Sequence, residues 1–215
     1  MKKTILIPYF SKEISMVDFV SVRMDNTKKY PINNNPWNYD FSGDVNFSIA
    51  YNDEAVLVKF FVVEEEIRAI YTQPNDPVYK DSCVEFFIGF NNEESYYNFE
   101  FNCKGTCLAG FGNGKDHRKP MNIEKIKSIK TSVTFKTISI QEKLMINWEL
   151  TLVIPNSVFQ FHQINSLKNQ VVSVNFYKCG DDLSKPHFLC WSPIESEHPN
   201  FHLSQYFGKA IFLDN

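Results

Sequence analysis

Residues 81–112 read DSCVEFFIGFNNEESYYNFEFNCKGTCLAGFG, and this stretch has the pattern of a β-meander. In its first expected strand an apolar set alternates with a mixed set, namely Val84, Phe86, Ile88 and Phe90 against Cys83, Glu85, Phe87 and Gly89. The second expected strand sets Tyr97, Phe99, Phe101 and Cys103 against Tyr96, Asn98, Glu100 and Asn102. Because successive side chains of a strand point to opposite faces, this hairpin has one apolar face and one face of amides, carboxylates and a tyrosine.

Strand patterns of the same kind recur along the rest of the chain. They cover residues 15–25, 44–52, 55–63, 133–140, 144–154, 171–178, 188–192 and 210–213. Residues 55–63 are apolar on both faces except for Lys59, which favours a central strand covered on both sides. Residues 110–120 are rich in glycine and should form a mobile loop, and residues 195–207 a second long loop. About ten short strands separated by turn signals indicate an all-β fold, a single-domain antiparallel β-sandwich.

The composition narrows the class of protein. The chain has 215 residues, 43% of them hydrophobic, which is enough for the core of one domain spanning residues 1–215. A net charge of -3 leaves no basic stripe for phosphates, so we expect no nucleic-acid partner. There is no apolar run long enough to span a membrane, and no signal peptide is visible, so we expect a cytoplasmic protein. The sequence leaves the oligomeric state open.

The five cysteines do not form a repeating disulfide framework, and we expect free thiols. Cys103 and Cys107 have the wrong spacing for a zinc-binding CxxC pair, and the histidines show no metal-ligand spacing. From the residues alone we therefore expect no metal site and no certain cofactor.

Polar side chains gather on one face of several expected strands. They are Glu85, Asn98, Glu100, Asn102, Asn147, Glu149, Ser173, Asn175 and Tyr177. If these strands are neighbours, one sheet presents amides, carboxylates and phenols with few lysines, a composition that suits hydroxyl-rich ligands. The alternative is the ordinary solvent-facing side of an antiparallel sheet.

Aromatic residues at strand ends and in loops add a second binding feature, because a flat ring can lie against the apolar face of a sugar. The candidates are Tyr71, Tyr79, Trp191 and Phe201. Trp191 also suits a core position, whereas Phe201 lies in a polar loop where exposure is expected. Arg68 either clamps a carboxylate or sugar hydroxyls, or pairs with Glu64 or Glu65.

An enzymatic alternative stays open at the same residues. Glu85 and Glu100 form a carboxylate pair on adjacent expected strands, and two carboxylates are the acid and base of most glycosidases. Carboxylates on neighbouring strands are commonly inert, so we expect a binding module rather than an enzyme, with no catalytic residue assigned.

Several motifs together resemble family 9 carbohydrate-binding modules and the related DOMON-like domains. The run from Asp81 to Ile88 resembles their D-S-x-V-E-x-F-I signature. Further matches are residues 98–102, Trp148 in a strand that ends at Pro155, residues 174–177, residues 191–193 and residues 207–208. The resemblance covers residues 40–213, and residues 175–178 resemble the branch found in polysaccharide-degrading gut bacteria.

The resemblance implies a jelly-roll-like β-sandwich that binds sugars between two aromatic rings, with a role in polysaccharide catabolism. The family commonly holds structural calcium, and DOMON-like relatives also include haem or redox modules. Glu85 matches the carboxylate of the signature, while Glu100 stands where the family has an arginine. Tyr79 lies beside one stacking position and Phe201 matches the other.

The leading hypothesis is therefore a non-catalytic module that binds a mono- or oligosaccharide. Its expected ligand-binding residues are Arg68, Tyr79, Glu85, Asn98, Glu100, Asn175, Tyr177, Trp191 and Phe201. The alternatives are a glycoside hydrolase that uses Glu85 and Glu100, and a DOMON-like haem or redox module.

Overall fold

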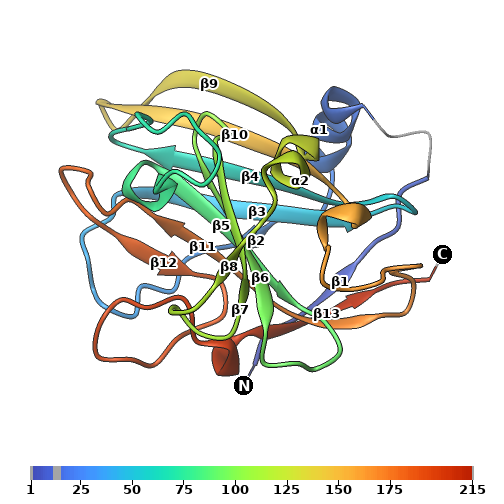
Figure 1. The fold of residues 1–215 in the computed structure, drawn as a ribbon. Helices are drawn as coiled ribbons and strands as arrows, with labels where there is room; N and C mark the ends of the chain where they lie inside the picture. The colour runs from blue at the N-terminus through green and yellow to red at the C-terminus, as the bar shows by residue number, and fades with distance from the viewer. Residues whose placement is uncertain (1, 12–15, 215) are drawn as a thin grey trace.

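The computed structural model describes residues 2–11 and 16–214, which form two β-sheets packed face to face (Figure 1). The smaller sheet has the strand order β2-β3-β4-β10-β9. Its strands are β2 (Tyr30–Pro31), β3 (Gly43–Tyr51), β4 (Ala55–Glu64), β10 (Lys143–Pro155) and β9 (Lys130–Ile140). The expected all-β sandwich is confirmed.

The larger sheet has the order β1-β13-β11-β5-β6-β7-β8, with β12 paired to β11. Its strands are β1 (Thr4–Ile7), β13 (Gly208–Phe212), β11 (Val171–Cys179), β5 (Cys83–Gly89), β6 (Tyr96–Asn102), β7 (Cys107–Gly112), β8 (Lys119–Pro120) and β12 (Phe188–Cys190). Within it β5, β6 and β7 form the expected meander. The pairing of β1 with β13 is parallel, whereas the other named strand pairs of the described residues are antiparallel.

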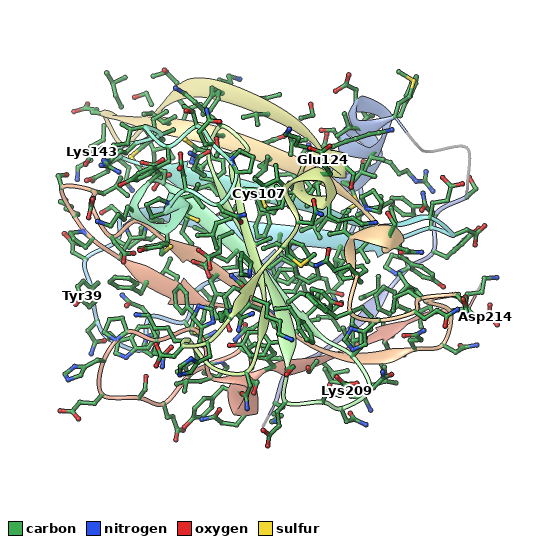
Figure 2. The ribbon with its side chains drawn as sticks, viewed as in Figure 1. Tyr39, Cys107, Glu124, Lys143, Lys209 and Asp214 are labelled. Atoms are coloured by element: carbon green, nitrogen blue, oxygen red, sulfur yellow. The ribbon has the colours of Figure 1, made fainter. Side chains whose placement is uncertain are left out.

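Side chains from both sheets fill the space between them (Figure 2). Phe47 of the smaller sheet stacks on Phe176 of the larger one at 3.6 Å between ring centroids, and Phe86 stacks on Phe176 at 5.0 Å. Trp148 is fully buried, and its indole N–H donates a 2.7 Å hydrogen bond to the Glu64 carboxylate. The apolar faces expected from strand alternation therefore form the core.

The described part of residues 15–25 forms a helix, α1 (Val17–Asp25), and the expected strand there is wrong. Val20 and Met24, four residues apart, are fully buried against the outer face of the smaller sheet. This packing outweighs the strand preference of the β-branched and aromatic residues. Ser15 lies outside the described residues.

Helix α1 also explains why β4 is covered on both faces, as the sequence indicated. Lys59 is 1% exposed, and its ammonium group pairs with Asp25 of α1 and, at 2.7 Å, with Glu149 of β10. Glu149 and Asn147 thus belong to the smaller sheet, away from the polar residues of β5, β6 and β11. The expectation that one sheet carries all of these polar residues is wrong for this pair.

The remaining regular segments are short. They are the helix α2 (Ile123–Ser128) and the 3-10 turns η1 (Val78–Lys80), η2 (Asn156–Val158) and η3 (Ser204–Tyr206). Among the described helices, none has the length and apolar character needed to cross a membrane. All five cysteines are buried and free, in agreement with the expected thiols.

Candidate functional site

The polar faces of β5, β6 and β11 meet on the outer side of the larger sheet. Glu85 lies directly opposite Glu100 on β6 and opposite Tyr177 on β11. Asn98 lies one pair further along, opposite Phe87. Because β5 is the middle strand of the three, side chains separated by up to about 90 residues in the sequence become neighbours on one face.

A pocket of about 290 Å³ opens on this face. It is lined by Tyr79, Glu85, Asn98, Glu100, Leu108, Lys115, Arg118, Cys179, Asp181, Phe188, Pro199, Asn200, Phe201 and His202. Strands form the floor, and the segments around residues 112–118, 181 and 199–202 form the rim. Five of the nine residues expected to bind ligand line the pocket, namely Tyr79, Glu85, Asn98, Glu100 and Phe201.

The two glutamates of the floor are almost completely buried, at 3% and 4% exposed. Burial raises the pKa of Glu100 to about 7, although the Asn98 amide opposes the shift by donating a 2.8 Å hydrogen bond to its carboxylate. Burial, with the neighbouring Cys179 and Glu100, raises the pKa of Glu85 well above its usual value. The floor therefore offers a proton-bearing carboxyl as a donor beside carboxyl oxygens that accept.

Arg118 holds the segment between β7 and β8 over the sheet. Its guanidinium donates to the Asn98 side chain at 2.8 Å and to the backbone carbonyls of Tyr96, Gly112 and Gly114 at 2.8, 3.1 and 2.9 Å. It also lies over the Tyr96 ring, 4.5 Å from the centroid. Sequence reasoning missed Arg118, because nothing in a glycine-rich loop shows where its side chains will reach.

Two further ionisable residues of the rim were also missed. Burial is the main cause that raises the pKa of Asp181 to about 6, and the negative charge of the neighbouring Asp182 adds to the rise. Burial is the main cause that lowers the pKa of His202 to about 3, and the positive charge of Arg118 adds to this effect. The His202 imidazole is therefore neutral near pH 7. The His202 ring nitrogen Nδ1 lies 3.0 Å from the Tyr96 hydroxyl. The rim thus combines a neutral imidazole, a carboxyl group and the cationic side chains of Lys115 and Arg118.

Phe201 supplies an aromatic wall but is not freely exposed. It is 8% exposed, and its ring stacks on Tyr177 at 4.2 Å with an interplanar angle of 13°. Trp37 and Phe188 pack around it, with centroids at 5.9 and 6.2 Å. The expectation of an exposed ring is wrong because this aromatic cluster covers most of Phe201 and leaves only its pocket side accessible.

Three of the other expected residues are enclosed in the protein. The Asn175 side chain is fully buried and bonds to the backbone N–H and C=O of Ser192 at 2.9 and 3.1 Å. Tyr177 is fully buried beneath Phe201, to whose carbonyl its hydroxyl donates at 3.1 Å. Trp191 is 2% exposed and packs against the core ring of Phe176, at 6.0 Å between centroids.

Arg68 pairs with different partners from those expected. Its guanidinium donates at 2.6 Å to the fully buried Asp81 carboxylate and lies 3.6 Å from Asp182, rather than pairing with Glu64 or Glu65. Asp81 also accepts hydrogen bonds from backbone N–H groups at residues 70 and 71. Arg68 therefore ties the 64–80 link to the start of β5, outside the pocket lining.

The family model of carbohydrate-binding family 9 matches residues 17–212. The chain belongs to carbohydrate-binding family 9. This match begins before residue 40, so the family segment includes α1 as well as the stretch recognised from motifs. No curated protein sequence matches the chain.

Solved structures agree with the family 9 assignment. A protein of Bacteroides uniformis, described provisionally as carbohydrate-binding, is 32% identical, with a TM-score of 0.90 over 99% of this chain and 100% of its own. A family 9 module of Caldicellulosiruptor kristjanssonii in complex with glucose has a TM-score of 0.65 at 13% identity, covering 99% of this chain and 97% of its own. The same module type in complex with cellotriose gives 0.64 at 14%, covering 99% and 95%. The last two share the fold.

Proposed function

We propose that this family 9 chain is a non-catalytic carbohydrate-binding protein that holds a mono- or oligosaccharide in the pocket over β5 and β6. The observation that carries the proposal is the pairing of an aromatic wall at Phe201 with buried carboxyl and amide groups at the floor. A sugar presents an apolar ring face and a rim of hydroxyls, and each needs one of these surfaces. The solved family 9 modules with glucose and cellotriose support this ligand class.

The size of the pocket favours one or two sugar rings at a time. A volume of about 290 Å³ lies at the small end of the range for ligand pockets. Glu85, Asn98 and Glu100 would bond the hydroxyls, while Phe201 and Tyr79 would contact the ring. Open sites of this size bind weakly, so we expect Kd values from about 1 μM to about 1 mM.

Calorimetric titration with glucose, cellotriose and a panel of other mono- and oligosaccharides tests the proposal. We expect Phe201→Ala to weaken binding of the best sugar about tenfold, equal to about 1.4 kcal/mol. Phe135→Ala is the matched control, because Phe135 is 47% exposed on β9 of the other sheet. Absence of binding to every sugar, or equal affinities for the two variants, would contradict the proposal.

The second candidate function is glycoside hydrolysis, and one observation favours it. The pKa of Glu100 near 7, raised by burial, suits a general acid at neutral pH. Its partner carboxyl, Glu85, lies directly opposite on β5. A hydrolase would turn over aryl glycosides and lose this activity in Glu85→Gln, whereas the binding protein shows no turnover at all.

Two other expectations from the resemblance are not strengthened by the pocket. Its described lining holds His202 but no methionine, so it gives no support to a haem site with a Met/His pair. Calcium prefers oxygen ligands, including backbone carbonyls. Structural calcium therefore stays a prediction from the family, with no residue assigned to it.

A further inference from the structure

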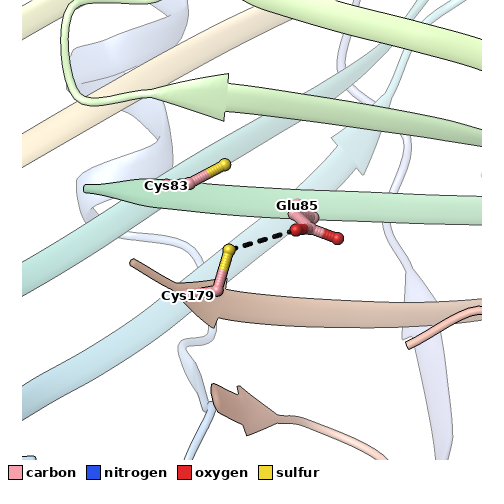
Figure 3. Close-up of side chains that lie close together, drawn as sticks. All are labelled: Cys83, Glu85 and Cys179. Atoms are coloured by element: carbon pink, nitrogen blue, oxygen red, sulfur yellow. Dashed lines mark hydrogen bonds between the residues drawn. The ribbon is translucent and has the colours of Figure 1, made fainter. Parts of the chain in front are cut away.

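Two cysteines and a glutamate converge at one end of the pocket floor (Figure 3). Cys83 of β5 and Cys179 of β11 are direct register partners, and Glu85 follows two residues after Cys83 on the same face. The two sulfur atoms and a carboxylate oxygen all lie within 4.8 Å of one another. The Cys179 thiol donates to the Glu85 carboxylate at 3.2 Å. Three strong metal ligands are thus already assembled on rigid strands.

We propose that Cys83, Glu85 and Cys179 form a binding site for a thiophilic divalent cation of the zinc class. In tetrahedral zinc sites the metal lies about 2.3 Å from sulfur and about 2.0–2.2 Å from a carboxylate oxygen, which places neighbouring ligand atoms about 3.5–3.8 Å apart. The present separations, all within 4.8 Å, are close to the spacing of that arrangement.

The fourth coordination position faces the pocket. Glu85 and Cys179 line the pocket, whereas Cys83 is fully buried and is not part of its lining. With three protein ligands on the floor side, a water molecule or an oxygen of a bound ligand completes the tetrahedron from the open side. Three protein ligands and one exchangeable position are the arrangement of catalytic and ligand-binding zinc sites, whereas purely structural sites use four protein ligands.

The ligand set selects the metal. Thiolates favour zinc, cadmium and copper(I), whereas calcium and magnesium require oxygen ligands. The site is therefore distinct from the structural calcium that family resemblance implies. On binding, the cation displaces to solvent the protons of both thiols and the proton held by the Glu85 carboxyl, leaving two thiolates and one carboxylate around it. The metal charge offsets much of this negative charge, and Lys115 and Arg118 line the same pocket.

Titration of the tag-free, reduced, full-length protein with cadmium tests the proposal. Cadmium–thiolate bonds give an ultraviolet charge-transfer band, and we expect it to saturate at one equivalent with the intensity of two thiolates. Zinc should displace cadmium in competition with a chromophoric chelator. X-ray absorption of the zinc form should show two sulfur ligands at about 2.3 Å.

Single-residue variants distinguish metal binding at this site from metal binding by the other cysteines. Replacing an outer partner of a metal ligand weakens binding about 10–100-fold, so removing a ligand in Cys83→Ser or Cys179→Ser should cost about 100-fold or more. Cys107→Ser and Cys190→Ser are the matched controls, because both cysteines are buried and lie outside the group. They should keep wild-type metal affinity. Circular dichroism establishes which variants fold.

Three results would overturn the proposal, and two of them need only the wild-type protein. No charge-transfer band at equimolar cadmium, or a zinc spectrum with fewer than two sulfur ligands, would do so, as would unchanged affinity in a folded Cys179→Ser variant. The site does not depend on sugar binding. Phe201→Ala should retain the metal, and titration of the metal-free protein with sugars tests the proposed function separately.

Discussion

Glu100 shows what can and cannot be read from the sequence at the scale of one residue. Strand alternation placed it on the same face as Glu85 and Asn98, and the structure puts all three around one pocket. The sequence did not show how deeply Glu100 is buried, because the segments around residues 112–118 and 199–202 complete its burial. The second of these segments lies far from Glu100 in the sequence. Strand alternation predicts the face on which a side chain lies. The segments that pack over that face in the folded protein determine how far the side chain is exposed to water, and hence its pKa.

The buried carboxyl of Glu100 should make stability depend on pH. Its pKa is about 7 in the folded protein and near 4.5 in the unfolded chain. Between these values the folded protein keeps a proton that the unfolded chain releases, so the free energy of unfolding falls as pH rises from about 4.5 to 7. A shift of this size corresponds to about 3 kcal/mol.

We therefore expect Glu100→Gln to flatten this slope and to be more stable than the wild type at pH 8. Urea unfolding between pH 4 and pH 8 measures the effect. Glu85 keeps part of the slope, because its pKa is raised in the same direction. Glu197→Gln is the control, since that side chain is 88% exposed and should leave the slope unchanged. A wild-type slope in Glu100→Gln would exclude the argument.

Asn175 was expected on the same polar face as Glu100, but we expect its side chain to contribute to stability and not to sugar binding. Its amide completes hydrogen bonds of the Ser192 and Phe176 backbone in the interior. Asn175→Ala removes the side-chain partner of three backbone groups, each at about 1–3 kcal/mol, so we expect a loss of at least about 3 kcal/mol in urea unfolding. Sugar affinity of the folded fraction should match the wild type. Reduced affinity with unchanged stability would instead place Asn175 among the ligand contacts.

At the scale of elements, local pattern identified the strands better than it identified α1. Residues 17–25 contain β-branched and aromatic residues that favour a strand, yet only Val20 and Met24 are buried, with a helical spacing of four. The outer face of β4 needs a cover, and that requirement comes from another part of the chain. A short segment with mixed preferences is decided by what it packs against.

The segment between β7 and β8 provides the prediction at this scale. Arg118 joins four backbone carbonyls and Asn98 through one planar guanidinium. A lysine offers a single point of charge and cannot reproduce this fork. We expect Arg118→Lys to speed amide hydrogen exchange in residues 112–118 about tenfold or more, a loss of about 1.4 kcal/mol of local stability.

Sugar affinity should fall together with that protection, because the segment forms part of the rim. Lys119→Arg is a suitable comparison, since Lys119 is exposed on β8 and should leave both measurements unchanged. Wild-type exchange rates in Arg118→Lys would show that other contacts hold the segment.

For the whole molecule, the sequence predicted the class of fold but not the pairing of distant strands. The hairpin of β5 and β6 is local, and the alternation of the 81–112 stretch was enough to recognise it. The pairing of β11 with β5 joins strands that have five other strands, the helix α2 and the 3-10 turn η2 between them in the chain. This pairing creates the pocket floor and brings Cys83 beside Cys179, so no spacing rule for metal ligands could have found that group.

The two ends of the described chain are part of the same sheet, which predicts how the molecule unfolds. β1 pairs with β13, and Ile7 is fully buried in the common core, whereas its neighbour Leu6 is 51% exposed. We expect Ile7→Ala to lower the free energy of unfolding by about 2–5 kcal/mol. Leu6→Ala should change it by less than about 0.5 kcal/mol.

Because β1 contributes to one shared core, tryptophan fluorescence and far-ultraviolet circular dichroism should report a single coincident transition in both variants. Trp148 and Trp191 lie in this core and sense its loss directly. If residues 4–7 were only an appendage, Ile7→Ala would leave the midpoint unchanged. Separate transitions for the two probes would divide the chain into more than one cooperative unit, against the single domain expected from the sequence.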